Sequence, residues 1–236
     1  MKTDDIKVRV GNEIIACSLD YNEINNKPSV IFLHGAGPSN KEQVKYLSEL
    51  FVKNNQNVIR FDFSGQGESS GVLQEASLLK RQIEALAIIK YFNMNMENLT
   101  IVGTSMGGYI ATSLAKLISI KNLILFCPAA YDIKAWDIQF NNGFTEILRR
   151  DISLLVSNID DLLESFIGKS LLVLAEKDEI IQPIIVDMYQ KVLTKKSNHF
   201  TYIIPESPHP IHRWVVDKDI VRTNILNEIC SFMSFA

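Results

Sequence analysis

The stretch Leu-Thr-Ile-Val-Gly-Thr-Ser-Met-Gly-Gly, residues 99–108, decides the fold of this chain. Its first four residues are largely apolar and β-branched and predict a buried strand, and the apolar pattern of residues 106–118 predicts a helix. Between them stands Gly103-x-Ser105-x-Gly107, whose small residues permit a sharp, strained reversal from strand to helix. Such a turn holds the Ser105 hydroxyl clear of the sheet edge, at the positive end of the following helix.

The alternative interpretation of this stretch is a glycine-rich turn that serves packing or phosphate binding. A dinucleotide-binding fingerprint requires Gly-x-Gly-x-x-Gly, and a phosphate-binding loop requires Gly-Lys-Ser or Gly-Lys-Thr. Neither pattern occurs around Ser105. The strand before this turn and the helix after it therefore favour a serine exposed for chemistry.

Apolar runs alternate with helical periodicity on both sides of this turn. Buried strands are expected at 29–33, 58–61, 99–102, 122–126, 171–174 and 200–204, and helices at 41–54, 76–92, 106–118, 184–193 and 217–232. Two shorter strands, 7–10 and 13–17, flank a Gly-Asn turn near the N-terminus. Near-continuous apolar strands joined by helices indicate an α/β fold, with a mostly parallel central sheet of about eight strands and helices on both faces.

Length and hydrophobic content predict a single domain over residues 1–236, since 236 residues with 47% hydrophobic side chains bury one sizeable core. Residues 131–169 form a long connection between two strands and carry short helical patterns near 146–148, 154–155 and 162–166. We expect this segment to be a small inserted cap over the site. Its aromatic side chains have two open roles, lining an acyl pocket or forming a small core of their own; they are Trp136, Phe140, Phe144 and Phe166.

Charge and composition exclude several classes of partner. A formal net charge of -3 and a sequence pI near 5.8 give no electrostatic reason to expect a nucleic acid or an anionic membrane, so a small molecule is the expected partner. The charged N-terminus is not a secretory signal and no apolar run is long enough to span a bilayer, so a cytoplasmic location is expected. The three cysteines lie far apart, which predicts neither a zinc site nor a disulfide framework. The oligomeric state cannot be inferred from the sequence.

A serine hydroxyl becomes a good nucleophile only when a base takes its proton and a third group orients that base. Open α/β sheets place such groups at the carboxyl ends of their strands. His209 and His212 both follow the final strand; the sequence favours His209, which is nearer the strand end, and leaves His212 open. Asp178 follows the strand at 171–174, and alternation along the chain does not separate it from its neighbours Glu176 and Glu179.

Four motifs, in order along nearly the whole chain, resemble those of the α/β-hydrolase family. His34-Gly35-Ala36-Gly37 is similar to its oxyanion loop, residues 62–69 to its Asp-x-x-Gly-x-Gly-x-Ser turn, and residues 103–107 to its nucleophile elbow. Asp178 with Ile181 and Pro183 is similar to its acid loop, and this match selects Asp178 over its rivals. The chain departs from the pattern at Ala175, where glycine is usual, and at Glu206-Ser207-Pro208, where a glycine usually precedes the histidine.

The resemblance implies an α/β-hydrolase fold and a serine hydrolase of the small esterase and acyl-hydrolase branch. It implies Ser105 as nucleophile, His209 as base and Asp178 as orienting acid, with the backbone N–H groups of Ala36 and Met106 as the oxyanion hole. The expected substrate is an ester or thioester of a small to medium acyl group, and no metal or organic cofactor is expected. Acyl transfer, peptide-bond cleavage and carbon–carbon hydrolysis by the same residues stay open, and a non-catalytic binding protein is a further alternative.

The resemblance also implies structural rather than catalytic roles for two parts of these motifs. His34 is expected to hold its loop through hydrogen bonds. Asp62, Gly65 and Gly67 are expected to form a tight turn beside the elbow.

Overall fold

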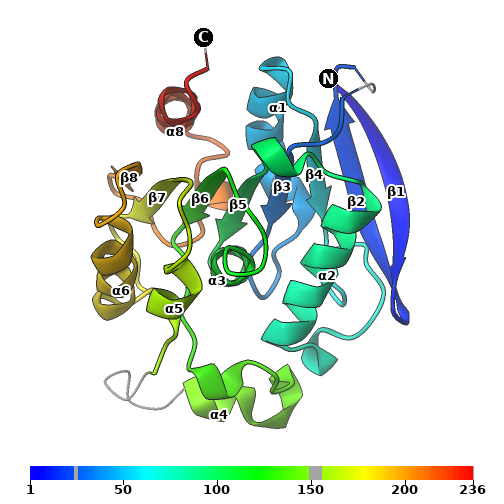
Figure 1. The fold of residues 1–236 in the computed structure, drawn as a ribbon, viewed down its shortest axis with the longest axis vertical. Coiled ribbons are helices and arrows are strands. Elements are labelled where there is room, and N and C mark those ends of the chain that lie inside the picture. Colours follow the sequence, from blue (N-terminus) through cyan, green and yellow to red (C-terminus); the bar gives the residue numbers. More distant parts are fainter. Residues whose placement is uncertain (24–25, 149–155, 236) are drawn as a thin grey trace.

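An eight-stranded sheet, in the order β1-β2-β4-β3-β5-β6-β7-β8, forms the centre of the molecule (Figure 1). The computed structural model describes residues 1–23, 26–148 and 156–235. The strands are β1 Lys2–Val10, β2 Glu13–Tyr21, β3 Val30–Leu33, β4 Val58–Phe61, β5 Thr100–Thr104, β6 Asn122–Phe126, β7 Lys169–Ala175 and β8 His199–Ile204.

The sheet is mixed rather than purely parallel. The strands β3 to β8 pair with one another in parallel, whereas β1 pairs with β2, and β2 with β4, in the antiparallel sense. The prediction of a mostly parallel sheet of about eight strands is confirmed. The hairpin of β1 and β2 runs several residues beyond its predicted limits because β1 is an exposed edge strand, whose charged residues carry no apolar alternation.

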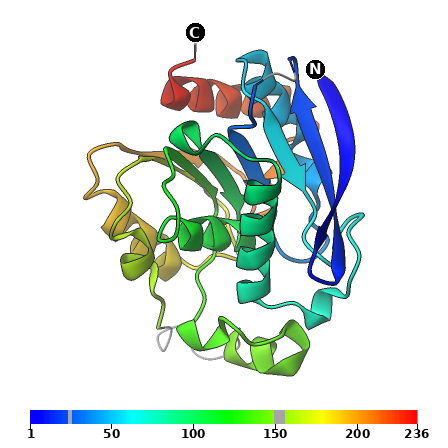
Figure 2. The same ribbon diagram turned by 45° about the vertical axis from the view of Figure 1, so that its right-hand side comes forward.

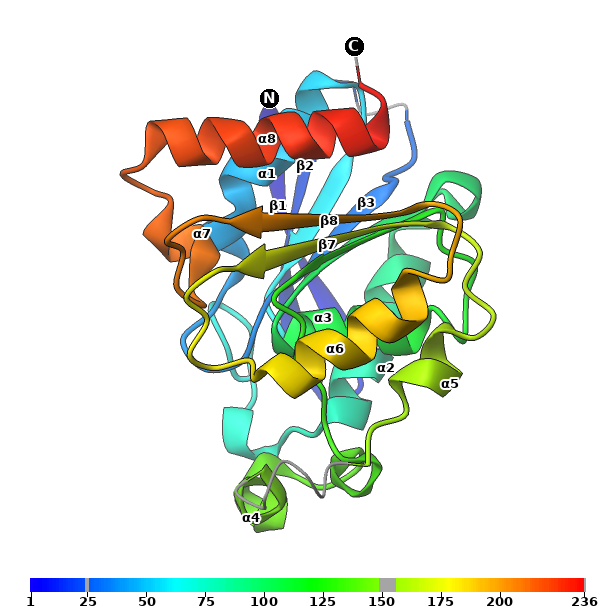
Figure 3. The same cartoon turned by 90° about the vertical axis from the view of Figure 1, so that its left-hand side faces the viewer.

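Helices cover both faces of the sheet, as predicted, and Figure 3 shows α1 and α8 on one face and α2, α3 and α6 on the other. The long helices are α1 Lys45–Lys53, α2 Leu78–Tyr91, α3 Met106–Leu114, α6 Pro183–Leu193 and α8 Asp219–Met233. Short turns are η1 Lys41–Val44, η2 Leu73–Glu75, η3 Met96–Asn98, η4 Ile133–Ala135 and η5 Phe140–Phe144, and short helices are α4 Thr145–Leu148, α5 Ile159–Leu163 and α7 Ile211–Trp214. In the described part of the chain, no helix combines the length and apolar content needed to cross a membrane.

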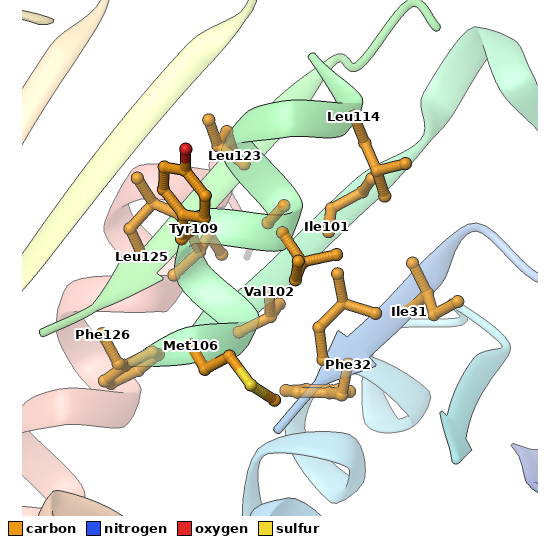
Figure 4. Packing of buried hydrophobic residues seen from close by; sticks show 14 of the residues in the cluster. Ile31, Phe32, Ile101, Val102, Met106, Tyr109, Leu114, Leu123, Leu125 and Phe126 are labelled. Atoms are coloured by element: carbon orange, nitrogen blue, oxygen red, sulfur yellow. The ribbon is translucent and has the colours of Figure 1, made fainter. Parts of the chain in front are cut away.

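The helix α3 lies at the centre of the core. All nine of its residues are buried. Figure 4 shows Met106, Tyr109 and Leu114 of this helix among apolar side chains of the strands β3, β5 and β6. A helix packed on all sides cannot shift without opening the core, so the turn at its N-terminus is rigidly supported.

The connection between β6 and β7 carries η4, η5, α4 and α5. Its first half lies beside the N-terminal end of α2 and contacts η2, the short turn that precedes α2 (Figures 1 and 2). Its aromatic rings pack on one another and on Tyr109 of α3: the Tyr131 and Trp136 ring centroids lie 5.2 and 6.0 Å from that of Tyr109, and those of Phe140 and Phe144 lie 4.7 Å apart. These contacts form a small aromatic core. The helical pattern predicted at 154–155 lies outside the described residues.

Candidate active site

Ser105 occupies the turn between β5 and α3 with φ 52° and ψ −116°, a backbone conformation that residues other than glycine rarely adopt. Two glycines make the turn possible. A Cβ on Gly107 would lie 2.1 Å from the carbonyl oxygen of Leu33, and one on Gly103 would lie 2.5 Å from that of Gly107. The structure therefore has the sharp turn that the sequence predicts, with Ser105 at its apex.

The imidazole of His209 bridges Ser105 and Asp178. Its Nε2 lies 3.1 Å from Ser105 Oγ, and its Nδ1 lies 2.8 Å from Asp178 Oδ2. The three side chains come from loops that follow β5, β7 and β8, at the carboxyl edge of the parallel strands. This geometry allows Nδ1–H to donate to the carboxylate while Nε2 accepts the serine proton.

His212, the alternative base, is brought to a different place. Its side chain is buried, and it lies within the short helix α7, which begins two residues after His209. Its Nε2 lies 2.8 Å from Thr104 Oγ1 and its Nδ1 lies 3.0 Å from the hydroxyl of Tyr46. Burial lowers the pKa of His212 to about 4, so the ring is neutral at physiological pH. Both of its nitrogens are engaged away from Ser105.

Asp178 is held by the backbone as well as by His209. Its Oδ1 accepts hydrogen bonds from the N–H groups of Ile180 at 2.9 Å and Ile181 at 2.8 Å. Burial alone would raise the pKa of this carboxyl, but the hydrogen bonds from His209, Ile181 and Ile180 outweigh it and lower the pKa. Of the rival acids, Glu176 instead accepts from the N–H of Glu206 at 2.8 Å.

The loop that begins at His34 is held by side chains rather than by regular structure. His34 Nδ1 lies 2.8 Å from the carbonyl oxygen of Gly35, and its Nε2 accepts the N–H of Phe63 at 3.0 Å, so Nδ1 carries the proton. Burial lowers the pKa of His34 to about 4. A neutral, doubly hydrogen-bonded ring has the loop-holding role expected of it.

Gln66 contacts the His34 loop, and the sequence did not predict this role. Its Nε2 donates to the carbonyl oxygens of Gly37 at 2.8 Å and Gly35 at 3.2 Å. The sequence carries no signal for this contact beyond the position of Gln66 inside the Asp62 turn, because the two segments meet only once β3 and β4 are paired.

The Asp62 turn has the tight conformation expected of it. Asp62 is buried and accepts the N–H groups of Lys41 at 2.6 Å and Glu68 at 2.9 Å. Gly65 and Gly67 have φ of 73° and 52°, and a Cβ on Gly67 would lie 2.1 Å from the Asp62 carboxylate. The turn places Gln66 against the His34 loop.

Both predicted oxyanion donors belong to peptide groups whose carbonyls are fixed. The carbonyl oxygen of Ser105, which shares a peptide group with the Met106 N–H, accepts from the N–H groups of Gly108 at 2.9 Å and Ala129 at 3.0 Å. The carbonyl of Gly35, which shares a peptide group with the Ala36 N–H, accepts from His34 and Gln66. Because a trans peptide is planar, fixing the C=O also fixes the N–H, which points the opposite way.

Cys127 lies behind the proposed triad. Its Sγ, a carboxylate oxygen of Asp178 and a ring nitrogen of His209 lie within 4.8 Å of one another, which makes them a potential set of metal ligands among the described residues. Burial, with the Asp178 charge beside it, raises the pKa of Cys127 well above its usual value. The protonated thiol is thus a poor nucleophile and a poor ligand.

A cavity of about 500 Å³ opens at Ser105. It lies between the His34 loop, represented by Gly35 to Gly37, and the loop from His209 to Arg213. Among the described residues that line it there is no Asp or Glu, and Arg213 is the only Lys or Arg. Ser105 and Ala36 both line this cavity.

Comparison with known proteins gives the family and the fold of the chain. Residues 24–156 match the model of a family described as serine aminopeptidase, S33. A stretch of 91 residues, 37% of the chain, is 33% identical to part of the multifunctional-autoprocessing repeats-in-toxin protein of Vibrio cholerae serotype O1. That match spans 2% of the length of the toxin protein.

Two solved structures illustrate the similarity of fold. An esterase from Pyrococcus furiosus superposes with a TM-score of 0.69 at 17% identity, over 96% of this chain and 91% of the esterase. Est1E from Butyrivibrio proteoclasticus, solved with ferulic acid bound, superposes with a TM-score of 0.68 at 19% identity, over 95% and 99% of the two chains. At these identities the likeness establishes the fold alone.

Proposed function

The chain belongs to the serine aminopeptidase S33 family of α/β-hydrolases, and from this premise we propose that it is a serine hydrolase that cleaves carboxylic esters or thioesters. Ser105 is the nucleophile, His209 the base and Asp178 the residue that orients the base. The observation that carries this proposal is the pair of contacts made by one imidazole, 3.1 Å to Ser105 Oγ and 2.8 Å to Asp178 Oδ2.

In the proposed reaction His209 Nε2 removes the Ser105 proton as Oγ attacks the ester carbonyl. The negative charge on the former carbonyl oxygen is stabilised by the N–H groups of Ala36 and Met106. His209 then gives its proton to the leaving alcohol or thiol as the acyl-enzyme forms. A water molecule, deprotonated by the same imidazole, attacks the acyl-enzyme and releases the acid. Asp178 stabilises the imidazolium in both halves of the cycle.

Ester cleavage is favoured over the aminopeptidase reaction that the family description names. An aminopeptidase must recognise the ammonium group of a peptide N-terminus, for which a carboxylate in the substrate site is the usual partner. In the part of the chain that the structure describes, the cavity at Ser105 is lined by no Asp or Glu and by the cationic side chain of Arg213. The two superposed structures, an esterase and a protein with ferulic acid bound, also support an acyl substrate.

We further propose that residues 131–169 are a small cap inserted within the domain. The support is the aromatic core that this segment forms against Tyr109 of α3, the helix that begins directly after Ser105. The domain is single, and the protein acts in the cytoplasm on a small molecule.

The first experiment is hydrolysis of p-nitrophenyl esters from acetate to dodecanoate, beside amino-acid p-nitroanilides, by the wild type and by Ser105→Ala and His209→Ala. We expect an optimum chain length for the esters, little cleavage of the anilides, and loss of ester cleavage in both variants. Faster cleavage of the anilides would assign the peptidase reaction instead. Wild-type ester cleavage by Ser105→Ala would refute the mechanism.

A further inference from the structure

Gln66 has a buried side chain whose amide faces the His34 loop. It is 5% exposed, and its Nε2 lies 2.8 Å from the carbonyl oxygen of Gly37 and 3.2 Å from that of Gly35. Its Oε1 is buried and receives no hydrogen bond from the described residues. Exchanging the two amide atoms would set an oxygen against two carbonyl oxygens, so only the observed orientation is consistent with its surroundings.

The other end of this amide, Nε2, holds two carbonyls of one loop, those of Gly35 and Gly37. An apolar side chain of similar size would fill the same space and make neither hydrogen bond. The glutamine therefore supplies donors to the His34 loop in addition to filling space.

The carbonyl of Gly35 is the more informative of the two partners. It also accepts a hydrogen bond from His34 Nδ1 at 2.8 Å, so two side chains fix its direction. This carbonyl and the N–H of Ala36 belong to the same planar trans peptide and point in opposite directions. A rotation of the Gly35 carbonyl would therefore turn the Ala36 N–H by the same angle.

We propose that Gln66 is a positioning residue for the oxyanion hole, acting through the peptide between Gly35 and Ala36. The inference rests on the proposed function, because it assumes that the Ala36 N–H stabilises the oxyanion formed when Ser105 attacks. A donor contributes to the rate only when it is aimed at the position that the oxyanion occupies. Gln66 thus acts on the transition state and leaves the binding of the ester unchanged.

The variant Gln66→Leu keeps the volume of the side chain and removes its donor. We expect kcat to fall by about 10- to 100-fold with KM within about twofold of the wild type. The loss is smaller than that of a whole oxyanion donor, which is about 10²- to 10³-fold, because His34 still holds the Gly35 carbonyl.

The pH dependence of kcat in the variant Gln66→Glu distinguishes a positioning role from a merely structural one. The protonated carboxylic acid donates one hydrogen bond to the loop, whereas the carboxylate donates none. Burial beside carbonyl oxygens raises the pKa of such a carboxyl toward neutrality. We expect this variant to lose kcat as the pH rises, along an alkaline limb that the wild type lacks.

The experiment measures kcat and KM for p-nitrophenyl butyrate from about pH 6 to about pH 9, with thermal unfolding of each variant. Gln82→Leu is the matched control, since Gln82 is a half-buried glutamine whose Nε2 donates at 2.8 Å to Ser113 Oγ, away from the site. Support requires a kcat loss for Gln66→Leu, an alkaline limb for Gln66→Glu and neither for Gln82→Leu.

Wild-type kcat in Gln66→Leu, a loss confined to KM, or a pH profile of Gln66→Glu parallel to that of the wild type would each overturn the role of Gln66. If Gln66→Leu does not fold, the profile of Gln66→Glu decides alone. Ser105→Ala is measured alongside. If it keeps wild-type activity, the proposed function fails and this inference with it; if it is inactive while both Gln66 variants behave as wild type, only this inference fails.

Discussion

Thr104 and His212 share a hydrogen bond of 2.8 Å between Oγ1 and Nε2, directly beside Ser105. The contact ties the end of β5 to α7, the short helix that follows His209. His212 thus supports the two loops that carry the proposed nucleophile and base without touching the serine.

Replacing His212 with phenylalanine tests this supporting role. The ring packing against Phe126 is kept, while the hydrogen bonds to Thr104 and Tyr46 are lost. We expect unfolding free energy to fall by about 1–3 kcal/mol, measured by urea denaturation, with ester hydrolysis within about tenfold of the wild type. In contrast, His209→Phe should lose about 10⁴-fold or more in kcat. A reversal of the two activities would make His212 the base.

Asp178→Asn should lower kcat by about 10⁴-fold with the fold intact. In the wild type one carboxylate oxygen accepts from both Ile180 and Ile181, and the other faces His209. An asparagine would turn its oxygen to the two N–H groups and its NH₂ to His209 Nδ1, so Nε2 would carry the proton and could not act as base. Steady-state kinetics beside Glu176→Gln check this, because that control should keep activity within about twofold of the wild type. Equal losses in the two variants would contradict the role of Asp178.

Acidification should destabilise the protein through its buried histidines. The pKa of His34 and that of His212 are both lowered by burial, from 6.5 to about 4. Between these values the unfolded chain binds more protons than the folded one, so stability falls as the pH drops from about 6.5 to about 4. Each histidine contributes a loss of about 3 kcal/mol across this window. Thermal unfolding at several pH values should show a shallower dependence for His212→Phe; an unchanged slope would refute its part in the effect.

Gly107→Ala should be far more damaging than a substitution at a turn with open space. The added Cβ would lie 2.1 Å from the Leu33 carbonyl oxygen and 2.5 Å from that of His34. We expect a loss of about 3 kcal/mol or more in unfolding free energy. Gly11→Ala is the control, since its φ is 59° with no atom within 4 Å of the new Cβ, and about 1–2 kcal/mol of backbone strain is expected there. Similar urea midpoints for the two variants would contradict the steric argument.

The apolar strands were the most predictable part of this fold. The predicted limits 58–61 and 122–126 agree with β4 and β6 at both ends, because a strand buried on both faces is a mostly apolar run. The edge strand β1 was predicted too short, since its charged residues gain nothing from burial and are held by pairing with β2. The short helices between β6 and β7 depend on tertiary contacts with α2 and α3, which periodicity does not report.

The residues of the candidate site also differ in how far the sequence predicts them. Ser105 was predictable because its turn needs glycines at fixed spacing, which the sequence displays. The sequence favoured His209 but did not exclude His212, because the distinction is which ring turns into the core at the start of α7 and which faces Ser105. Gln66 was missed because its partners are backbone carbonyls, which are the same atoms in every residue.

The proposed catalytic residues are distant in the chain, and this separation bears on how the protein acquires activity. Ser105 and His209 lie 104 positions apart, and their contact requires β8 to have joined β7 at the far end of the parallel strands. Contacts of such long range form late in folding, after local helices. During refolding, recovery of hydrolysis should therefore lag behind recovery of the helical circular-dichroism signal. The recovery of hydrolysis would then report when β8 joins the sheet.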